Sequence, residues 1–222
     1  MSALVIALLG AESTGKTTLA RELARRLAED TGLRVACVPE HLRTWCDEHG
    51  RTPRQDEQAS IARAQDDAIE AAAAAHDIVV ADTTSVMVAI YSRFIFGDDS
   101  LIPSAVDFMR ARVASTLVTA IDLPWRADGM RDGPHVREPV MTLLRSVLVD
   151  HGLPWSIVGG KGPARLEAAL DAVAPLVRTL PAARRGLFTR LADRNAQASA
   201  RTWRCEHCDD PDCEHALKQQ GD

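Results

Sequence analysis

The sequence predicts an α/β fold in which a five-stranded parallel sheet is flanked by helices. Two observations support this prediction. Five short apolar stretches rich in Val and Ile alternate with helical segments, and continuous apolar runs are typical of parallel strands that are buried on both faces. The first of these stretches also leads directly into GAESTGKTT at residues 10–18, which matches the pattern G-x-x-x-x-G-K-[ST] of a loop that wraps phosphates.

The predicted strands are the short apolar stretches at residues 3–9, 34–39, 78–81, 116–121 and 155–158. The helical segments between them are expected at residues 16–29, 55–75, 84–94, 103–112, 138–151 and 162–179. In sheets of this kind ligands bind at the carboxyl ends of the strands. The residues that follow the strands are the phosphate loop, PEHLRTW, ADTT, DLPWRADGMRDGPHVR and GGKGP. We therefore expect the candidate polar groups to share one edge of the sheet.

Composition excludes several classes of protein. Hydrophobic residues make up 46% of the 222 positions and charged residues 26%, as in soluble globular proteins. The net charge of −5 gives no general electrostatic case for nucleic acid, and no apolar run approaches the ~20 residues that span a membrane. The first apolar run lacks the basic flank of a signal peptide, so the five cysteines are expected to be thiols or metal ligands. We expect a cytoplasmic monomer or a small oligomer such as a homodimer.

The phosphate loop (residues 10–18) predicts a nucleoside-triphosphate site. Gly10 and Gly15 allow the tight turns that direct backbone N–H groups inward. Lys16 would reach the β- and γ-phosphates and the Thr17 hydroxyl would ligate Mg²⁺. The residues expected to contact ATP in this loop are Gly10, Glu12, Ser13, Thr14, Gly15, Lys16, Thr17 and Thr18.

The residues after the third strand favour phosphoryl transfer to a small acceptor over hydrolysis. Guanine-specific switches carry an N-K-x-D motif, which this sequence lacks. AAA-type motors place a water-activating Glu directly after the Asp of the third strand, but here Thr83 follows Asp82. A kinase has no use for such a base, because water at the γ-phosphate wastes ATP.

Two carboxylates and a group of arginines could serve this transfer. Glu40 and Asp82 are both placed to orient or deprotonate the acceptor hydroxyl, and one of them could instead hold Mg²⁺ through water; a capping or ion-pair role is the alternative. Arg126, Arg131 and Arg137 lie among Gly, Asp and Pro residues. They could form a cationic lid over the phosphates, or a solvated surface loop.

Several of these segments together resemble the ribosylnicotinamide kinase domain of the NadR-like proteins, within the P-loop nucleoside and nucleotide kinases. The matching segments are GAESTGKTTLA, the PE after the second strand, QASIARAQ, ADTTSVMVAIYSRFIFG and DLPWRADGMRD…R, within residues 3–180. The resemblance implies ATP-dependent phosphorylation of the 5′-hydroxyl of nicotinamide riboside to give nicotinamide mononucleotide. It also implies that Lys16 and Thr17 handle ATP and Mg²⁺, that Asp82 lies beside the metal and the acceptor, and that the Arg131 region is the lid.

Aromatic residues near the strand ends are compatible with such a substrate. Nicotinamide riboside carries a pyridinium cation, which favours aromatic faces and carboxylates. Trp45, Tyr91 and Trp125 follow the second, third and fourth strands and could stack on this ring, with Asp128 nearby. Alternatively, they fill gaps between the helices and the sheet.

The sequence pattern changes after residue 180. We expect a kinase domain at 1–180, a basic helix or linker at 181–204 and a Cys/His-rich tail at 205–222. The tail has the order C-x2-C-x4-C-x-H, which could form a small structural Zn²⁺ site or remain a thiol-rich segment that binds metal only adventitiously. The candidate zinc ligands are Cys205, Cys208, Cys213 and His215.

Two other functions remain open from the sequence. Arginines precede the tail, but six acidic residues among the last eighteen positions would repel nucleic-acid phosphates, so nucleic acid is not expected as a partner. One alternative is a P-loop ATPase-type regulator with a zinc-stabilised interaction tail. The other is a kinase for a different nucleoside or sugar.

Overall fold

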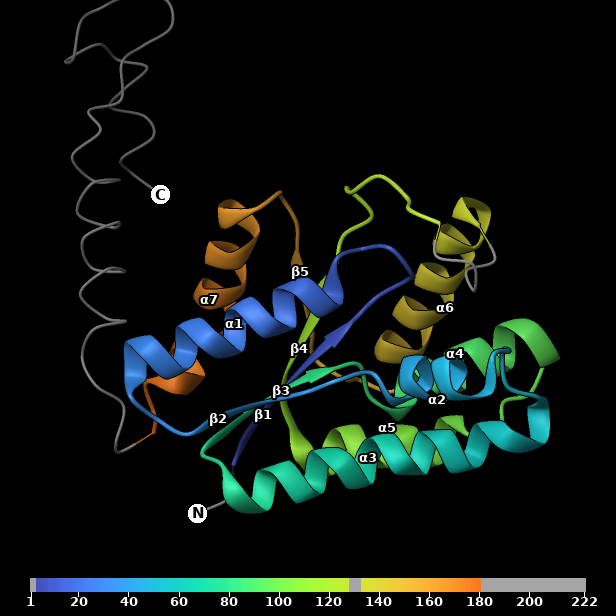
Figure 1. The fold of residues 1–222 in the computed structure, drawn as a ribbon, viewed down its shortest axis with the longest axis horizontal. Helices are drawn as coiled ribbons and strands as arrows, with labels where there is room; N and C mark the ends of the chain where they lie inside the picture. The colour runs from blue at the N-terminus through green and yellow to red at the C-terminus, as the bar shows by residue number, and fades with distance from the viewer. Residues whose placement is uncertain (1–2, 128–132, 181–222) are drawn as a thin grey trace, which may run out of the picture. The chain divides into compact units, whose positions relative to one another are not determined.

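The structure is a computed structural model that describes residues 3–127 and 133–180 (Figure 1). The predicted sheet is present, and all of its paired strands are parallel. Its order is β2-β3-β1-β4-β5. The strands are β1 (Leu4–Leu9), β2 (Val35–Val38), β3 (Ile78–Asp82), β4 (Val113–Thr119) and β5 (Ser156–Val158). This confirms the α/β fold class that the alternating pattern predicts.

Helices cover both faces of the sheet and make three layers (Figure 1). On one face α1 packs against α7. On the other, α4 packs against both α3 and α5, and α3 and α5 contact the strands. The helices are α1 (Lys16–Thr31), α2 (His41–His49), α3 (Gln58–Ala75), α4 (Ser85–Phe96), α5 (Ile102–Arg112), α6 (Arg137–Asp150) and α7 (Pro163–Val177), with short 3₁₀ helices η1 (Gln55–Glu57) and η2 (Pro134–Val136). Because β1 and β3 are covered on both sides, every residue in these two strands is buried, which explains their continuous apolar sequences.

The strand order places the phosphate loop beside the end of β3. From β1 the chain crosses to the edge strand β2 and returns to β3, while the other half of the sheet extends through β4 and β5. The carboxyl end of β1 is therefore the switch point at which open α/β sheets bind ligands. In the β1–β3 register, Leu8 is paired with Asp82, so Asp82 lies at the level where the phosphate loop begins.

Two elements differ from the sequence-based expectation. Helix α2 was not predicted, because HLRTWCDEH is polar and buries only Cys46, so it shows little apolar periodicity. Strand β4 begins at Val113, directly after α5 ends at Arg112, rather than at residue 116. Its first paired residue, Val113, lies before a register shift against β1, and this irregular start has no strong pattern in the sequence.

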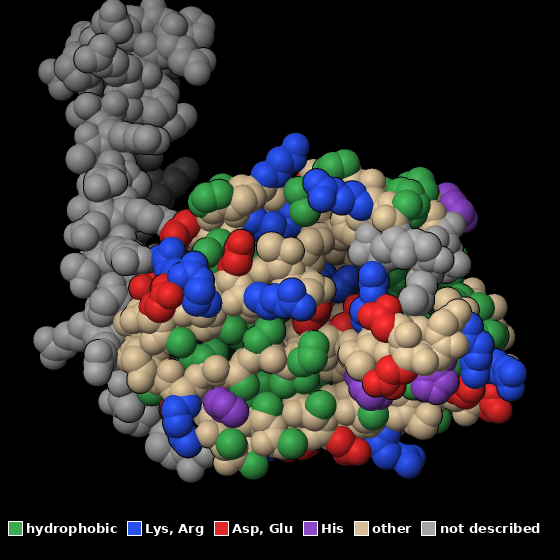
Figure 2. Space-filling model, in the orientation of Figure 1, with side chains coloured by type: hydrophobic (Ala, Val, Ile, Leu, Met, Phe, Trp, Pro, Cys, Tyr) green, Lys and Arg blue, Asp and Glu red, His purple; other side chains and the backbone are tan. Residues whose placement is uncertain are grey.

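Charged side chains of both signs share the surface in view. Figure 2 shows Lys and Arg side chains interspersed with Asp and Glu across this face of the described residues. Among residues 3–127 and 133–180, no helix combines the length and apolar character required to cross a bilayer. The segments 181–204 and 205–222, for which we expect a basic linker and a Cys/His-rich tail, lie outside the described residues.

Candidate active site

The phosphate loop adopts a backbone conformation that depends on glycine. Gly10 has a φ of 148° and Gly15 a φ of 79°. A Cβ atom at Gly10 would lie 2.4 Å from the Thr119 hydroxyl oxygen at the end of β4, so a larger residue would displace the loop from the sheet. Helix α1 begins at Lys16 with no side-chain hydrogen bond at its N-cap. Its first N–H groups can therefore bind an anion such as a phosphate.

Short hydrogen bonds inside the loop hold this conformation. The Thr14 hydroxyl donates to the Ala11 carbonyl at 2.8 Å and lies 2.7 Å from the Thr119 hydroxyl. The Lys16 ammonium donates to the same Ala11 carbonyl at 2.9 Å, and the Lys16 side chain is almost buried. These bonds hold the loop folded, with the Lys16 side chain directed across it to Ala11.

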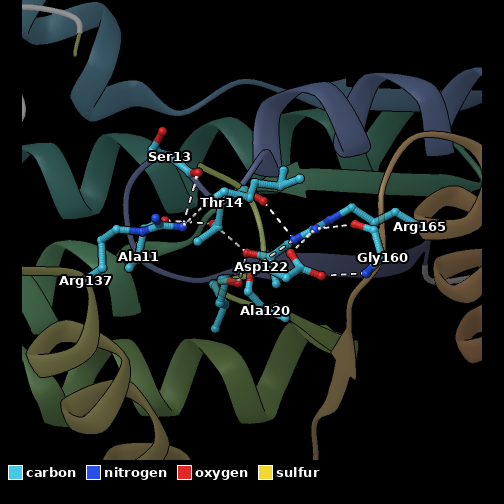
Figure 3. A network of polar contacts seen from close by, with 11 residues as sticks. Ala11, Ser13, Thr14, Ala120, Asp122, Arg137, Gly160 and Arg165 are labelled. Atoms are coloured by element: carbon cyan, nitrogen blue, oxygen red, sulfur yellow. Dashed lines mark hydrogen bonds and ion pairs between the residues drawn. The ribbon is translucent and has the colours of Figure 1, made fainter. Parts of the chain in front are cut away.

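Arg165 of α7 links this loop to the ends of β4 and β5 (Figure 3). One terminal nitrogen of the guanidinium donates to the carbonyls of Thr14 (2.8 Å) and Ala120 (3.2 Å). The second terminal nitrogen donates to Asp122 (2.6 Å) and to the Gly160 carbonyl (2.8 Å). Partial burial raises the pKa of Asp122, but hydrogen bonds from Arg165 and from the Gly160 N–H outweigh it and hold this pKa below its ordinary value. The carboxylate is therefore a charged anchor for the arginine.

Arg137 at the start of α6 approaches the loop from the opposite side to Arg165 (Figure 3). Its guanidinium donates to the Leu123 carbonyl at 3.0 Å and to the Ser13 carbonyl at 3.5 Å, and only 6% of Arg137 is exposed. From its position in the sequence, Arg137 is expected to be one of the cations that meet the phosphates. In the structure this side chain supports the backbone of the phosphate loop.

The segment after β4 is hydrogen-bonded directly to the phosphate loop. The Trp125 indole N–H donates to Glu12 at 2.8 Å, and the Arg126 backbone N–H donates to the Ser13 hydroxyl at 2.9 Å. Trp125, expected to stack on a substrate ring, is therefore joined to a residue that we expect to contact ATP.

Asp82 is a buried carboxylate that the described protein leaves without a hydrogen bond. It is 1% exposed, and neither of its oxygens has a partner among the described residues. Asp82 also affects Cys37 on β2, because burial and, after it, the nearby charge of Asp82 raise the pKa of the Cys37 thiol. An unpaired buried carboxylate is costly, so Asp82 is a candidate to bind a cation or to accept from a hydroxyl.

The turn after Asp82 is braced from α3. Thr83 adopts a left-handed φ of 73°, unusual for a β-branched residue, and its N–H donates to Leu8 at 3.1 Å. The buried Gln65 amide donates to the carbonyls of Thr83 (3.5 Å) and Pro39 (3.4 Å) and accepts from the His41 N–H (2.6 Å). Gln65 therefore connects the end of β3 to the segment that carries Glu40.

The phosphate loop, the end of β3 and the segment around Glu40 line one cleft of about 1450 Å³. This volume is larger than the ~300–1,000 Å³ typical for a single small ligand. Ten residues of the sequence-predicted site line this cleft, namely Glu12, Ser13, Thr14, Gly15, Lys16, Thr17, Thr18, Glu40, Asp82 and Tyr91. Basic side chains contribute on several sides, from Lys16, Arg21, Arg43, Arg54 and Arg126. The cleft therefore has the volume to hold a triphosphate together with a second molecule, and its basic side chains lie among the carboxylates of Glu12, Glu40, Asp47 and Asp82.

Other predicted residues lie elsewhere. The Trp45 ring stacks on His49 with centroids 3.9 Å apart, lies under Arg51 and is not among the residues that line the cleft. Arg131, Asp128 and the candidate zinc ligands Cys205, Cys208, Cys213 and His215 lie outside the described residues. Within residues 3–127 and 133–180 there is no group of three or more His, Cys, Asp or Glu side chains that could hold a metal ion.

Three residues of the site were not predicted from the sequence, all for the same reason. Arg165, Gln65 and Gln58 are polar residues on helices, where their side chains look like parts of a solvated face. All three are buried, and Gln58 lines the cleft. The sequence signal that could have found Arg165 is its place two residues after GGKGP, at the ligand-binding edge of the sheet.

The fold and the loop together define a P-loop nucleoside-triphosphate-binding protein. The sequence model of a family described as an AAA domain matches residues 5–165, and the chain belongs to this family. No significantly similar sequence is found among curated proteins.

Solved structures with the same fold include two NadR structures. NadR in complex with NR aligns with a TM-score of 0.64 and 23% identity, over 78% of this chain and 50% of that one. NadR in complex with NAD and AMP-PNP gives 0.62 and 22%, over 78% and 49%. This chain thus spans about half the length of the NadR proteins, and the likeness confirms that it has the P-loop fold found in NadR. Thymidylate kinase from Ehrlichia chaffeensis aligns with a TM-score of 0.54 and 14% identity, over 79% of this chain and all of the other.

Proposed function

We propose that this protein is an ATP-dependent kinase that phosphorylates the ribose 5′-hydroxyl of nicotinamide riboside to give nicotinamide mononucleotide. The observation that carries the proposal is the buried, unpartnered carboxylate of Asp82, which lines the same cleft as the phosphate-loop residues Lys16 and Thr17. Phosphoryl transfer requires this combination of a phosphate cradle and a nearby carboxylate.

The structural neighbours support this class of function. One NadR structure holds NR and another holds AMP-PNP, and thymidylate kinase shares the fold over its whole length. At identities of 14–23% these neighbours support the fold alone. The proposal of nicotinamide riboside as the acceptor therefore depends on the sequence motifs and on the chemistry of the cleft.

The residues present fit a magnesium nucleotide. The unpartnered oxygens of Asp82 are hard ligands of the kind that Mg²⁺ prefers, directly or through water, and the exposed Thr17 hydroxyl lines the same cleft. When bound, Mg²⁺ neutralises the charge of the phosphates. Lys16 and the first N–H groups of α1 then bind the phosphate oxygens.

Asp82 and Glu40 are the two candidates for the group that orients the acceptor hydroxyl and takes its proton. Asp82 is held at the end of β3, whereas Glu40 precedes α2 and is partly exposed. Arg126 lines the cleft, and with Arg131 it would stabilise the negative charge of the transferring phosphate. Thr83, at the position of the water-activating glutamate of ATPases, has no base to offer, which favours transfer over hydrolysis.

The acceptor ring is proposed to lie against Tyr91. This side chain is partly buried and lines the cleft, and an aromatic face attracts a pyridinium cation. Asp128 and Trp125 remain proposed contributors, Trp125 from its position beside Glu12.

The test is ADP release by the purified protein with ATP and Mg²⁺, alone and with nicotinamide riboside, adenosine, cytidine or uridine. Strong stimulation by nicotinamide riboside alone is the expected result. Stimulation only by another nucleoside would retain the mechanism and replace the acceptor.

A P-loop ATPase-type regulator is the second candidate, favoured by the match to a family described as an AAA domain. It predicts a slow release of ADP that no acceptor changes. That result would refute the kinase assignment.

A further inference from the structure

One wall of the cleft is formed by the segment that leads into α3. Thr52, Pro53, Arg54, Gln55 and Gln58 all line the cleft. This wall is separate in sequence from the phosphate loop and from Asp82. We assign this wall to the part of the cleft that a second molecule would occupy.

Glu57 holds this wall in place. Its carboxylate accepts two hydrogen bonds from the Arg51 guanidinium, at 2.6 and 2.7 Å, and one from the Arg54 backbone N–H at 2.7 Å. These bonds lower the pKa of Glu57 to about 2, so the carboxylate stays charged at neutral pH. The first turn of α3 is consequently fixed where Gln58 begins it.

Gln58 has a buried polar atom with no partner. It is 3% exposed, and its side-chain carbonyl oxygen has no hydrogen bond within the described protein. Gln65, two turns further along the same helix and equally buried, has hydrogen bonds to three backbone groups. Buried amides are normally satisfied in this way, so Gln58 differs from Gln65: it lines the cleft, and its side-chain carbonyl oxygen has no partner among the described residues.

We propose that Gln58 is a specificity-determining residue that hydrogen-bonds a polar amide group of the acceptor nucleoside. This inference rests on the proposed kinase function and identifies which side chain reads the acceptor. A glutamine amide can accept from an N–H and donate to a carbonyl, so it is complementary to a carboxamide such as that of nicotinamide riboside. A glutamine that only supported the fold would use these bonds within the protein, as Gln65 does.

A two-by-two comparison tests the contact. The substrates are nicotinamide riboside and pyridinium riboside, which lacks the carboxamide, and the proteins are the wild type and Gln58→Leu, a variant of similar size without polar atoms. If the Gln58 amide and the substrate carboxamide form a hydrogen bond, removing either group should lower kcat/KM by about tenfold or more. Removing both groups should then lower kcat/KM no further than removing one. The KM for ATP should stay within about twofold in every case.

Gln55→Leu is the matched control. Gln55 lines the same wall but is exposed, so this variant should keep the preference for nicotinamide riboside. Thermal unfolding of the ligand-free proteins gives a further readout. Because Gln58→Leu removes a buried, unsatisfied group, its Tm should equal or exceed that of the wild type, whereas a structural role predicts a clear decrease.

The outcomes separate the two proposals. Three results would overturn the role of Gln58 and leave the proposed kinase function intact. The first is a kcat/KM that Gln58→Leu leaves unchanged, and the second is additive losses of kcat/KM in the two-by-two comparison. The third is a lower Tm of Gln58→Leu together with a raised KM for ATP. An absence of turnover with every nucleoside in the wild type would refute the kinase function itself, and the acceptor contact with it.

Discussion

Replacing Arg165 with alanine removes four hydrogen bonds that join the phosphate loop to β4 and to the loop after β5. Only 4% of Arg165 is exposed, and breaking a buried ion pair typically costs 3–5 kcal/mol. Here Asp122 keeps its bond from the Gly160 N–H and its side chain is 33% exposed, so water moderates the loss. We expect Arg165→Ala to lower the free energy of unfolding by about 3 kcal/mol, or the Tm by roughly 6–12 °C for a domain of this size.

The assay is thermal and urea unfolding at pH 7, with Arg25→Ala as the matched control. Arg25 pairs with Glu29 on an exposed helix face, so its loss should change stability by under about 1 kcal/mol. Arg165→Lys retains the charge but cannot bond all four oxygens, and should fall between the wild type and Arg165→Ala. Because Arg165 positions the Thr14 carbonyl, the alanine variant should also bind ATP more weakly.

The pH dependence of the stability difference between the wild type and Arg165→Ala follows from Asp122. Its folded-state pKa lies below the ordinary 3.8, so its stabilisation is present above pH 3.8 and is lost as the pH falls through the lower, folded-state pKa. The gap between wild type and Arg165→Ala should therefore narrow in acid. A destabilisation by Arg165→Ala at pH 7 no larger than that of Arg25→Ala would refute this account of the link.

Three further substitutions test the site. Lys16→Ala should abolish phosphoryl transfer while leaving the circular dichroism spectrum unchanged, and a near-normal kcat would contradict its role. Asp82→Asn should lower kcat by about a hundredfold or more with a much smaller rise in KM for the acceptor, so an effect confined to KM would assign the role to another carboxylate. Asp66 accepts from the Ser85 N–H, and burial raises its pKa from 3.8 to about 6. Because folding raises this pKa, the protonated form of Asp66 favours the folded state. This contribution to the free energy of unfolding is fully present below pH 3.8 and is lost as the pH rises through about 6. Asp66→Asn should therefore stabilise the protein by about 1–2 kcal/mol at pH 8, after allowance for solvent contact, with no gain at pH 3.5 in urea titrations.

The strands could be predicted because their burial leaves a local signature. Strands β1 and β3 are covered on both faces, so each reads as an uninterrupted apolar run. The phosphate loop could be predicted because its turns require Gly10 and Gly15 at fixed spacing. Helix α2 has no comparable signature, because its sequence is polar and buries only Cys46.

The support of the site could not be predicted because it depends on contacts distant in sequence. Arg165 and Thr14 are 151 positions apart. The position of Arg165 shortly after GGKGP places it at the ligand-binding edge of the sheet, but no local pattern indicates which loop it contacts. Similarly, Gln58 and Gln65 are both glutamines of one helix, and only the folded structure distinguishes the amide that binds backbone from the amide that lines the cleft. Asp82 was predicted from its position after a strand, but its lack of a partner required the structure.

The hydrogen bond between the Trp125 indole and Glu12 has a practical consequence for spectroscopy. The chain has four tryptophans, and Trp125 is bonded to the phosphate loop through its ring nitrogen. Trp45 is stacked on His49 outside the cleft. Indole emission responds to changes in nearby charge and hydrogen bonding, so Trp125 is an intrinsic optical reporter of nucleotide arrival. A variant with phenylalanine at the other three tryptophan positions would allow binding and release to be followed in real time without an added label.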